Sequence, residues 1–328
     1  MESHYDAHRP LLSVCIPVYG VEKYIERCAR SLFEQTMKDG VEFIFVDDCT
    51  PDGSIDILKA VLEEYPNRTN QVRIIRHKQN KGLPQARKTA VEASSGKYIL
   101  NVDSDDWIEN NALESLIAKA HATDADIVLF DFLRVSGNSS TAVEQKVRRP
   151  DYLLSEMLKG KTPWMVWNKL FRRSLYFEPN PISFPTSFMS EDLVQTYQLV
   201  NRAKSICHLP LPLYNYRRPL ASPQNNSDID TRKIFKQTKN NIELLITAEN
   251  LDKRQPLVAD RMRMIAKFEL SSSFSNRSSR KDYIKAYPEL NFRILFNPVL
   301  PLRNRLHHLS ILLGFASMVP LVKTLIGK

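Results

Sequence analysis

The chain contains little of what marks secreted, zinc-binding or fibrous proteins. Its 328 residues include four cysteines, and no two of them have the CxxC spacing of a zinc site. Because these cysteines lie far apart, we expect a reducing compartment. The N-terminal segment MESHYDAHRP lacks a basic region followed by an apolar core. We therefore expect no signal peptide and a cytoplasmic location.

Repeats and long apolar runs are also missing. No low-complexity tract, collagen period, sustained heptad or internal repeat occurs, which argues against fibrous and solenoid folds. The apolar stretch at 309–328, LSILLGFASMVPLVKTLIGK, is interrupted by Pro320 and Lys323. A membrane-spanning helix needs about 20 continuous apolar residues. We therefore expect this stretch to lie peripherally on the inner leaflet of the cell membrane or to pack on the protein as core.

Charge is unevenly distributed along the chain, whose net charge is +9. Residues 1–133 hold 15 Lys and Arg against 22 Asp and Glu, a net charge of −7, whereas residues 134–328 hold 31 against 15, a net charge of +16. A basic surface could face nucleic acid, anionic lipid or a phosphorylated substrate. Solvated helix faces are the simpler explanation for most of these basic residues.

Short apolar segments alternate with amphipathic segments over residues 11–135. The apolar segments have the composition of strands buried on both faces of a sheet; they are 11–19, 41–48, 71–77, 97–103 and 125–135. The amphipathic segments have the period of helices; they are 21–36, 54–65, 82–94 and 111–122. This alternation predicts an α/β fold with a mostly parallel sheet flanked by helices.

The pattern changes after Val135. Helical segments at 152–160 and 190–203 and an extended segment at 205–219 follow, and residues 230–290 are polar and mostly helical. We predict a domain over residues 1–225, with a nucleotide-binding half at about 11–135 and an acceptor half at about 136–225. A mainly helical C-terminal region is predicted for residues 226–328.

Three carboxylates follow the fourth predicted strand, in YILNVDSDDW (residues 98–107). Ligands of parallel sheets bind beyond the carboxyl ends of the strands, and Asp103, Asp105 and Asp106 lie at such an end. Mg²⁺ and Mn²⁺ prefer carboxylate oxygens and leave room for substrate phosphates. Helix capping is the alternative. Because capping does not require three carboxylates that repel one another, the cluster favours a metal.

Candidate ligand-binding residues also lie at the ends of the first two predicted strands. Pro17, Val18 and Tyr19 end the first strand, and Asp47 and Asp48 end the second. These groups should meet the acidic cluster at one edge of the sheet. An aspartate in this place could accept a hydrogen bond from a nucleotide base, or it could simply belong to a turn, since DDCTPDGS is rich in turn-forming residues.

Two charged motifs in the second half each have two interpretations. Glu191 and Asp192, in FMSED, suit the first turn of a helix, and an aspartate there could also act as a general base. Taken alone, capping is the better interpretation. Arg217 and Arg218, in YNYRRPLAS, suit the recognition of a diphosphate or form a solvated pair.

An aromatic and basic segment, PWMVWNKLFRRS, precedes them. Trp164, Trp167, Asn168 and Lys169 could form an acceptor platform for a sugar. They could also be core residues, although asparagine and lysine are seldom fully buried.

Taken in order, these segments resemble the family 2 glycosyltransferases of the GT-A fold. The resemblance rests on SVCIPVYGVEKYIERCARSLFEQT, FIFVDDCTPDGS and NKGLPQARKTAVEASSGKYILNVDSDDWI, followed by WNKLF, SED and YNYRRPLAS. It is dense over about residues 11–135 and patchy to about residue 223. It implies a Rossmann-like GT-A domain that transfers a sugar from a nucleotide-diphosphate donor with inversion, usually with Mg²⁺ or Mn²⁺.

The resemblance also implies roles for individual residues. The donor would be bound by Pro17, Val18, Tyr19, Glu22, Asp48, Lys81, Gly82, Arg87, Asp103 and Ser104, with Arg217 or Arg218 closing over the diphosphate. Asp105 would bind the metal together with Asp103. Asp192 would be the catalytic base, with Glu191 beside it. Gly20 and Cys49 depart from the family pattern at positions that carry no chemistry.

The resemblance therefore implies an inverting glycosyltransferase that uses a nucleotide-diphosphate sugar, with a UDP-sugar expected. Its acceptor would be a glycan or a lipid-linked molecule in cell-surface polysaccharide synthesis. A sugar nucleotidyltransferase is an alternative, but PVYGVEKY has a single glycine where that class usually has a glycine-rich phosphate loop. A basic membrane-surface or nucleic-acid-binding module with a degenerate site is another. The intact acidic motifs argue against it, and we expect no nucleic-acid partner.

Overall fold

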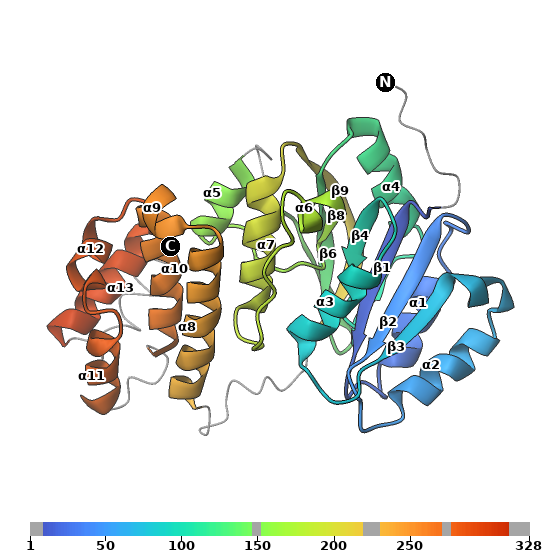
Figure 1. The fold of residues 1–328 in the computed structure, drawn as a ribbon, viewed down its shortest axis with the longest axis horizontal. Coiled ribbons are helices and arrows are strands. Elements are labelled where there is room, and N and C mark those ends of the chain that lie inside the picture. The colour runs from blue at the N-terminus through green and yellow to red at the C-terminus, as the bar shows by residue number, and fades with distance from the viewer. Residues whose placement is uncertain (1–8, 146–151, 219–229, 271–276, 315–328) are drawn as a thin grey trace.

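The computed structural model describes residues 9–145, 152–218, 230–270 and 277–314 (Figure 1). Within them the strands form one nine-stranded sheet in the order β3-β2-β1-β4-β8-β6-β9-β5, with β7 paired to β6. The strands are β1 (Leu12–Val18), β2 (Val41–Asp47), β3 (Val72–Arg76), β4 (Tyr98–Asn101), β5 (Trp107–Ile108), β6 (Ile127–Ser136), β7 (Ser139–Val143), β8 (Lys169–Arg172) and β9 (Ile206–Arg217).

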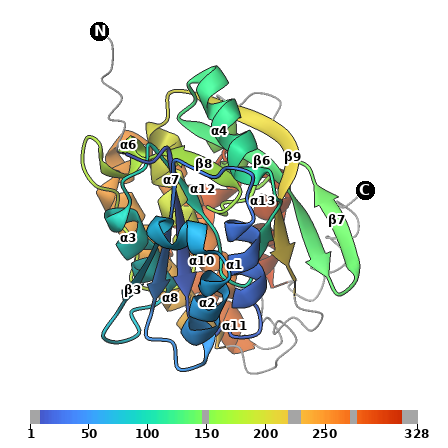
Figure 2. The same ribbon diagram turned by 90° about the vertical axis from the view of Figure 1, so that its right-hand side faces the viewer.

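Most neighbouring strands of the first half are parallel, as the sequence predicts. The ladders β3-β2, β2-β1 and β1-β4 are parallel, and so is β6-β9. Strand β8 lies between β4 and β6 and is antiparallel to both. Strand β5 is antiparallel to β9, and β7 is antiparallel to β6, beside which it lies at the right of Figure 2. The α/β class and the mostly parallel sheet are therefore confirmed.

Helices cover both faces of this sheet because alternate residues of each central strand point to opposite sides. On one face Val14, Ile16 and Phe43 pack with α1 (Ile25–Phe33), α2 (Ser54–Glu63) and α4 (Ala112–Thr123). On the other face Cys15 and Ile44 pack with α3 (Leu83–Ala93), α5 (Leu153–Leu158), α6 (Ser174–Phe177) and α7 (Glu191–Arg202). A 3₁₀ turn, η1 (Pro66–Gln71), leads into β3.

The C-terminal region is helical, as predicted, and packs against α7 (Figure 1). Its helices are α8 (Thr231–Ala248), α9 (Leu251–Arg254), α10 (Pro256–Glu269), α11 (Arg277–Lys285), α12 (Leu290–Phe296) and α13 (Leu302–Leu313). Leu193, Val194 and Tyr197 of α7 share one buried cluster with Ile242 and Met262 of this region. Helix α7 therefore has one side on the sheet and another on the C-terminal helices.

Some details differ from the sequence-based expectation. The first helix begins at Ile25 rather than near Val21, because residues 21–24 form a turn in which the Val21 carbonyl accepts from the N–H groups of Tyr24 and Ile25. The two-residue strand β5 carries no periodic signal that could have predicted it. No helix among the described residues is both long and apolar enough to cross a membrane. Most of the apolar stretch 309–328, from residue 315 onward, lies outside the described residues.

Candidate active site

The ends of β1, β2 and β4 meet at a cavity of about 590 Å³, called here the donor cavity. Eight of the residues predicted to bind donor or metal line it: Pro17, Val18, Tyr19, Asp48, Gly82, Asp103, Ser104 and Asp105. Since β2, β1 and β4 are adjacent parallel strands, their carboxyl ends bring together side chains that lie far apart in the sequence. Glu22, Lys81, Arg87, Arg217 and Arg218 do not line this cavity.

Asp48 is buried, and its carboxylate organises the loop that leads into α3. Its Oδ1 faces His77 Nδ1 at 2.6 Å and accepts from the Lys81 N–H at 2.8 Å. Its Oδ2 accepts from the Gly82 N–H at 2.7 Å. Gly82 has a φ of +85°, a conformation that residues with a Cβ rarely adopt. Asp48 thus shapes the wall of the donor cavity, in addition to any contact with a base.

Arg87 of α3 links the acidic groups of two distant segments. Its guanidinium is buried and donates to Asp103 Oδ1 at 2.6 Å, to Asp192 Oδ1 at 2.7 Å and to Glu191 Oε1. Asp103 follows β4, whereas Glu191 and Asp192 begin α7. One cation therefore neutralises part of a carboxylate cluster that joins the donor cavity to the start of α7.

Burial shifts the protonation of this cluster. Burial raises the pKa of Glu191 well above its usual range, against the attraction of Arg87 and with the repulsion of Asp192. Burial also raises the pKa of Asp103, although Arg87 opposes that shift. The pKa of Asp106 rises to about 8, through burial and then through the charges of Asp103 and Asp105. Such shifts are typical of functional sites.

The start of α7 is not a conventional helix cap. Ser190 occupies the N-cap position with a left-handed backbone, φ +59°, and its side chain caps no N–H group of the helix. Glu191 instead interacts with Arg87 and accepts from Gln195 Nε2 at 2.6 Å. The contacts of Glu191 and Asp192 are therefore with the acidic site, which the capping interpretation does not explain.

Arg217, at the end of β9, contacts the two aspartates of the acidic cluster that Arg87 does not bind. Its Nη2 donates to Asp105 Oδ2 at 3.0 Å, and its backbone N–H donates to Asp106 Oδ1 at 2.7 Å. Its guanidinium carbon lies 3.7 Å from the centre of the Tyr24 ring. Arg218 is exposed. Of the two arginines, Arg217 is the one that contacts the acidic site.

The donor set fits Mg²⁺ or Mn²⁺ held jointly with a substrate. Among the described residues no three His, Cys, Asp or Glu side chains form a complete metal site. Asp105 lines the donor cavity, with 39% of its side chain exposed, and Asp103 lies beside it. Mg²⁺ is commonly held by one or two carboxylates plus substrate phosphates, which is what these residues could provide. Such an ion would compete with Arg217 for Asp105.

The structure buries three of the four residues considered as an acceptor platform. Trp167 stacks on Tyr214, with ring centres 4.4 Å apart, and the Tyr214 hydroxyl donates to Asp106 Oδ2 at 2.8 Å. Asn168 and Lys169 are fully buried, and Lys169 Nζ donates to Met165 O at 2.6 Å and to Asn168 Oδ1 at 2.7 Å.

Trp167, Asn168 and Lys169 are therefore core residues in the structure and do not form an exposed platform. Burial lowers the pKa of Lys169 to about 7, and the charge of Asp192 opposes that shift. Trp164 is partly buried against Tyr197 of α7.

Sequence reasoning missed several residues that line the donor cavity: Val21, Asn80, Leu83, Ala86, Phe188 and Tyr216. Phe188 is the most informative, because 58% of this large aromatic side chain is exposed. Its position as the first residue of the FMSED motif, three residues before Glu191, is the signal that could have found it.

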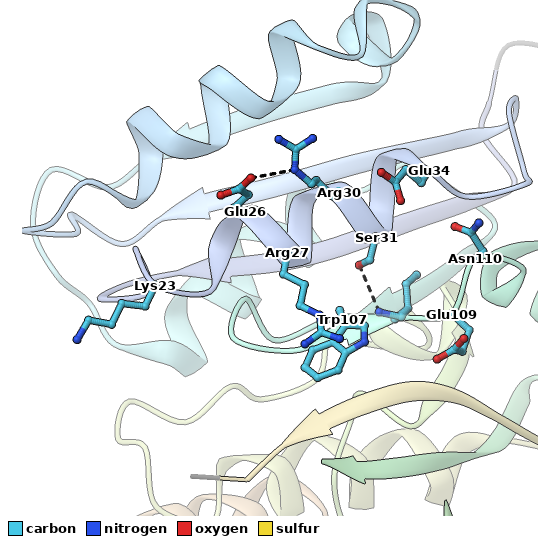
Figure 3. A pocket seen from close by; sticks show the side chains of 10 residues that line it. Lys23, Glu26, Arg27, Arg30, Ser31, Glu34, Trp107, Glu109 and Asn110 are labelled. Carbon is cyan, nitrogen blue, oxygen red and sulfur yellow. Dashed lines mark hydrogen bonds and ion pairs between the residues drawn. The ribbon is translucent and has the colours of Figure 1, made fainter. Parts of the chain in front are cut away.

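A second cavity, of about 640 Å³, lies beside α1 and β5 (Figure 3). The Arg27 guanidinium lies 3.3 Å from the Trp107 ring centre, and Arg30 pairs with Glu26 and Glu64. This cavity shares no lining residue with the donor cavity. Because most of its charged groups are already engaged within the chain, Arg27 with Trp107, Arg30 with Glu26 and Glu64, Glu34 with Tyr65 and Glu109 with Asn215, it carries no assignment.

Replacing Arg87 with methionine should destabilise the chain strongly. Removing one partner of a buried ion pair typically costs about 3–5 kcal/mol, because the remaining charge is left uncompensated. Asp103 and Glu191 already have raised pKa values, so protonation relieves the cost below their folded-state pKa. The loss in free energy of unfolding should therefore be small near pH 4 and grow as the pH rises toward 7.

Urea denaturation of both proteins across this pH range provides the measurement. Arg30→Met is a matched control, since Arg30 makes a bidentate ion pair with Glu64 at the surface. Water screens that pair, so its loss should matter much less. Equal destabilisation by the two substitutions would contradict the role given to Arg87.

Comparison with known proteins places this geometry in context. The family described as Glycosyl transferase family 2 matches residues 13–197. The putative glycosyltransferase EpsH of Bacillus subtilis is 32% identical over 222 residues, which are 65% of this chain and 62% of EpsH. The chain thus spans about three fifths of that relative.

Solved structures show the same fold. TarS 1–349 of Staphylococcus aureus, in complex with UDP-GlcNAc, superposes with a TM-score of 0.70 at 18% identity, covering 95% of this chain and 90% of that one. The mannosyltransferase PcManGT of Pyrobaculum calidifontis, in complex with GDP-Man and Mn²⁺, gives a TM-score of 0.53 at 15% identity, covering 98% and 89%. With the family match over more than half of the chain, these findings establish a GT-A fold, and the protein belongs to glycosyltransferase family 2.

Proposed function

We propose that this glycosyltransferase transfers a sugar from a UDP-sugar, with inversion, to a hydroxyl group of a glycan or lipid-linked acceptor in cell-surface polysaccharide synthesis. The observation that carries the proposal is the Arg87 cluster. It holds Asp192 next to Asp103, so an acidic side chain at the start of α7 lies beside the donor cavity. A single displacement needs the base and the donor on adjoining walls of one site.

The named relatives support the choice of substrates. TarS, whose structure was solved with UDP-GlcNAc, is a poly(ribitol-phosphate) β-N-acetylglucosaminyltransferase. We therefore propose a uridine-diphosphate sugar as the donor of this chain and a polymer as its acceptor. The structure with GDP-Man makes a guanosine donor the alternative to test.

In this proposal, residues at the ends of β1 and β4 bind the donor, and Asp192 at the start of α7 acts on the acceptor. Pro17, Val18 and Tyr19 would hold the base and ribose, as they line the donor cavity at the end of β1. A divalent cation bound at Asp105 would neutralise the charge that develops on the leaving diphosphate. Arg217, displaced from Asp105, would be placed to contact the same diphosphate.

Asp192 would act on the acceptor. Its Oδ1 is held by Arg87, and its carboxylate would accept the proton of the acceptor hydroxyl while that oxygen attacks the anomeric carbon. The bond from the anomeric carbon to the diphosphate breaks as the new glycosidic bond forms. Attack from the face opposite the leaving group inverts the configuration.

The metal assignment can be tested through donor binding. Asp105→Ala should abolish Mn²⁺-dependent binding of UDP-sugar, because it removes the carboxylate that faces the donor cavity, and should leave the thermal transition near that of the wild type. A panel of UDP- and GDP-sugars with and without Mn²⁺, followed by calorimetry and by nucleotide release, provides the measurement. Unchanged affinity and unchanged metal dependence in the variant would refute the assignment.

The assignment of Asp192 predicts a change in rate without a change in donor affinity. Asp192→Asn keeps the shape of the side chain but removes the proton acceptor, which should slow transfer by on the order of 10²–10⁴. Asp56→Asn is the control, because Asp56 is an exposed first-turn residue of α2. Wild-type turnover by Asp192→Asn would mean that another group takes the proton.

We also propose that the chain attaches peripherally to the cytoplasmic leaflet through α12 and α13. Large apolar side chains are exposed there: Phe292, Phe296, Leu302, Leu306 and Leu313. Residues 277–314 hold seven Lys and Arg against two Asp and Glu. Basic side chains near an anionic membrane contribute about 1 kcal/mol each, and exposed apolar side chains add their buried area. A lipid-linked acceptor would be found at the same surface.

Membrane attachment can be tested by sedimentation with vesicles that contain anionic lipid. The double substitution Phe292→Ser and Phe296→Ser should weaken binding by more than about tenfold, because each aromatic side chain loses its burial in the interface. Leu211→Ser is the control, since Leu211 is exposed on β9. Equal binding by both variants, or no binding by the wild type at low salt, would eliminate this surface.

A further inference from the structure

The loop that precedes α7, residues 183–190 and called here the Phe188 loop, is fixed by three amide side chains from three helices. Gln198 of α7 accepts from the Ser183 N–H at 2.8 Å and donates to the Ser183 carbonyl at 2.9 Å. Gln85 of α3 donates to the Pro185 carbonyl at 2.8 Å. The third amide is Asn241 of α8, in the C-terminal region.

Asn241 bonds to the two residues of this loop that flank Phe188, namely Ser187 and Met189. Its Nδ2 donates to the Ser187 carbonyl at 2.8 Å and to the Met189 carbonyl at 2.7 Å, and its Oδ1 accepts from the Ser187 hydroxyl at 3.1 Å. These contacts fix the backbone immediately before and after Phe188. The Asn241 side chain is buried, with 2% exposed, so its hydrogen-bonding capacity is spent on this loop.

The Phe188 side chain itself is mostly exposed. It is 58% exposed and lines the donor cavity, although its neighbours Ser187 and Met189 are held by the buried amide of Asn241. The backbone is therefore fixed while the aromatic ring remains available for contact with a ligand. The face of an aromatic ring suits the apolar C–H groups of a sugar.

The same loop leads directly into the acidic pair. Ser190 takes a left-handed backbone conformation, and the Glu191 N–H donates to the Phe188 carbonyl at 3.4 Å. A displacement at residues 187–189 would therefore move both the ring in the donor cavity and the carboxylates that Arg87 binds. Errors of about 1 Å in such a position can cost on the order of 10²-fold in rate.

We propose that Asn241 is a positioning residue through which the C-terminal region holds Phe188 against the transferred sugar and Asp192 at the start of α7. The proposal rests on the proposed function, since it assigns a sugar to the donor cavity. In this proposal α8 affects the active site indirectly, through the Phe188 loop that Asn241 holds.

The test compares Asn241→Asp with Asn240→Asp in the full chain. The two substitutions make the same chemical change in adjacent residues, but Asn240 is exposed. A carboxylate at position 241 cannot donate to the two carbonyls and repels them. We expect the turnover number of Asn241→Asp to fall by about 10–100-fold, the dissociation constant of UDP to stay within about twofold because the β1, β2 and β4 ends are untouched, and Asn240→Asp to behave as the wild type.

Hydrogen exchange of the ligand-free proteins gives a readout that is independent of activity. We expect faster exchange at residues 183–192 in Asn241→Asp alone, with the sheet unchanged. If the wild type transferred no sugar from any donor, the proposed function would fail, and hydrogen exchange would still decide whether Asn241 fixes the loop.

Phe188→Ala covers the case in which Asn241→Asp unfolds, because an exposed loop side chain can be shortened with little effect on folding. It should lower turnover with UDP affinity retained, and adding Asn241→Asp to it should cost less than the product of the two single losses. Wild-type turnover in Phe188→Ala, or exchange in Asn241→Asp that matches Asn240→Asp, would overturn the proposal.

Discussion

A single buried guanidinium holds the two walls of the site together. Arg87 bonds to Asp103 at the end of β4 and to Glu191 and Asp192 at the start of α7. Without this cation, the buried Glu191 and the partly buried Asp103 and Asp192 would lie together with no positive charge between them, and loss of one partner from such a buried group typically costs several kcal/mol. Electrostatic attraction by Arg87 therefore acts together with apolar packing to hold the start of α7 beside the donor cavity.

This constraint explains why residues around the site are polar yet buried. Tyr214 accepts from the Asp103 N–H at 3.1 Å and donates to Asp106. Trp167 stacks on Tyr214, and Lys169 satisfies carbonyl groups of the segment that carries Trp167. Trp167, Lys169 and Tyr214 are buried. Tyr214, on which Trp167 stacks, bonds to Asp106 and to the backbone of Asp103, which lines the donor cavity, and this is a reason for Trp167 other than acceptor binding.

Local signals in the sequence were sufficient for β1, β2, β3, β4, β6 and β9 and for the residues at the ends of β1, β2 and β4, but not for β5, β7 and β8. Short apolar runs followed by turn residues mark β1, β2 and β4, and the topology of a parallel sheet then places Tyr19, Asp48 and Asp105 together. The contact of Arg87 with Asp192 spans 105 residues, and no local pattern encodes it. Lys169 was unexpected in the core because burial of lysine is rare, and three oxygen acceptors make it tolerable here. Phe188 has an apolar side chain that suggests a core residue, and although its place in FMSED points to the site, the fold is needed to show that it is exposed in the donor cavity.

The central claim is that the acidic end of β4 and the start of α7 form one site for a nucleotide-diphosphate sugar. Anomalous diffraction from a crystal of the chain with UDP and Mn²⁺ tests it most directly. The account predicts one Mn²⁺ peak between the Asp105 carboxylate and the diphosphate, with the uracil against Pro17, Val18 and Tyr19, and with Arg217 moved away from Asp105. A metal peak elsewhere, or a nucleotide bound outside the donor cavity, would contradict it.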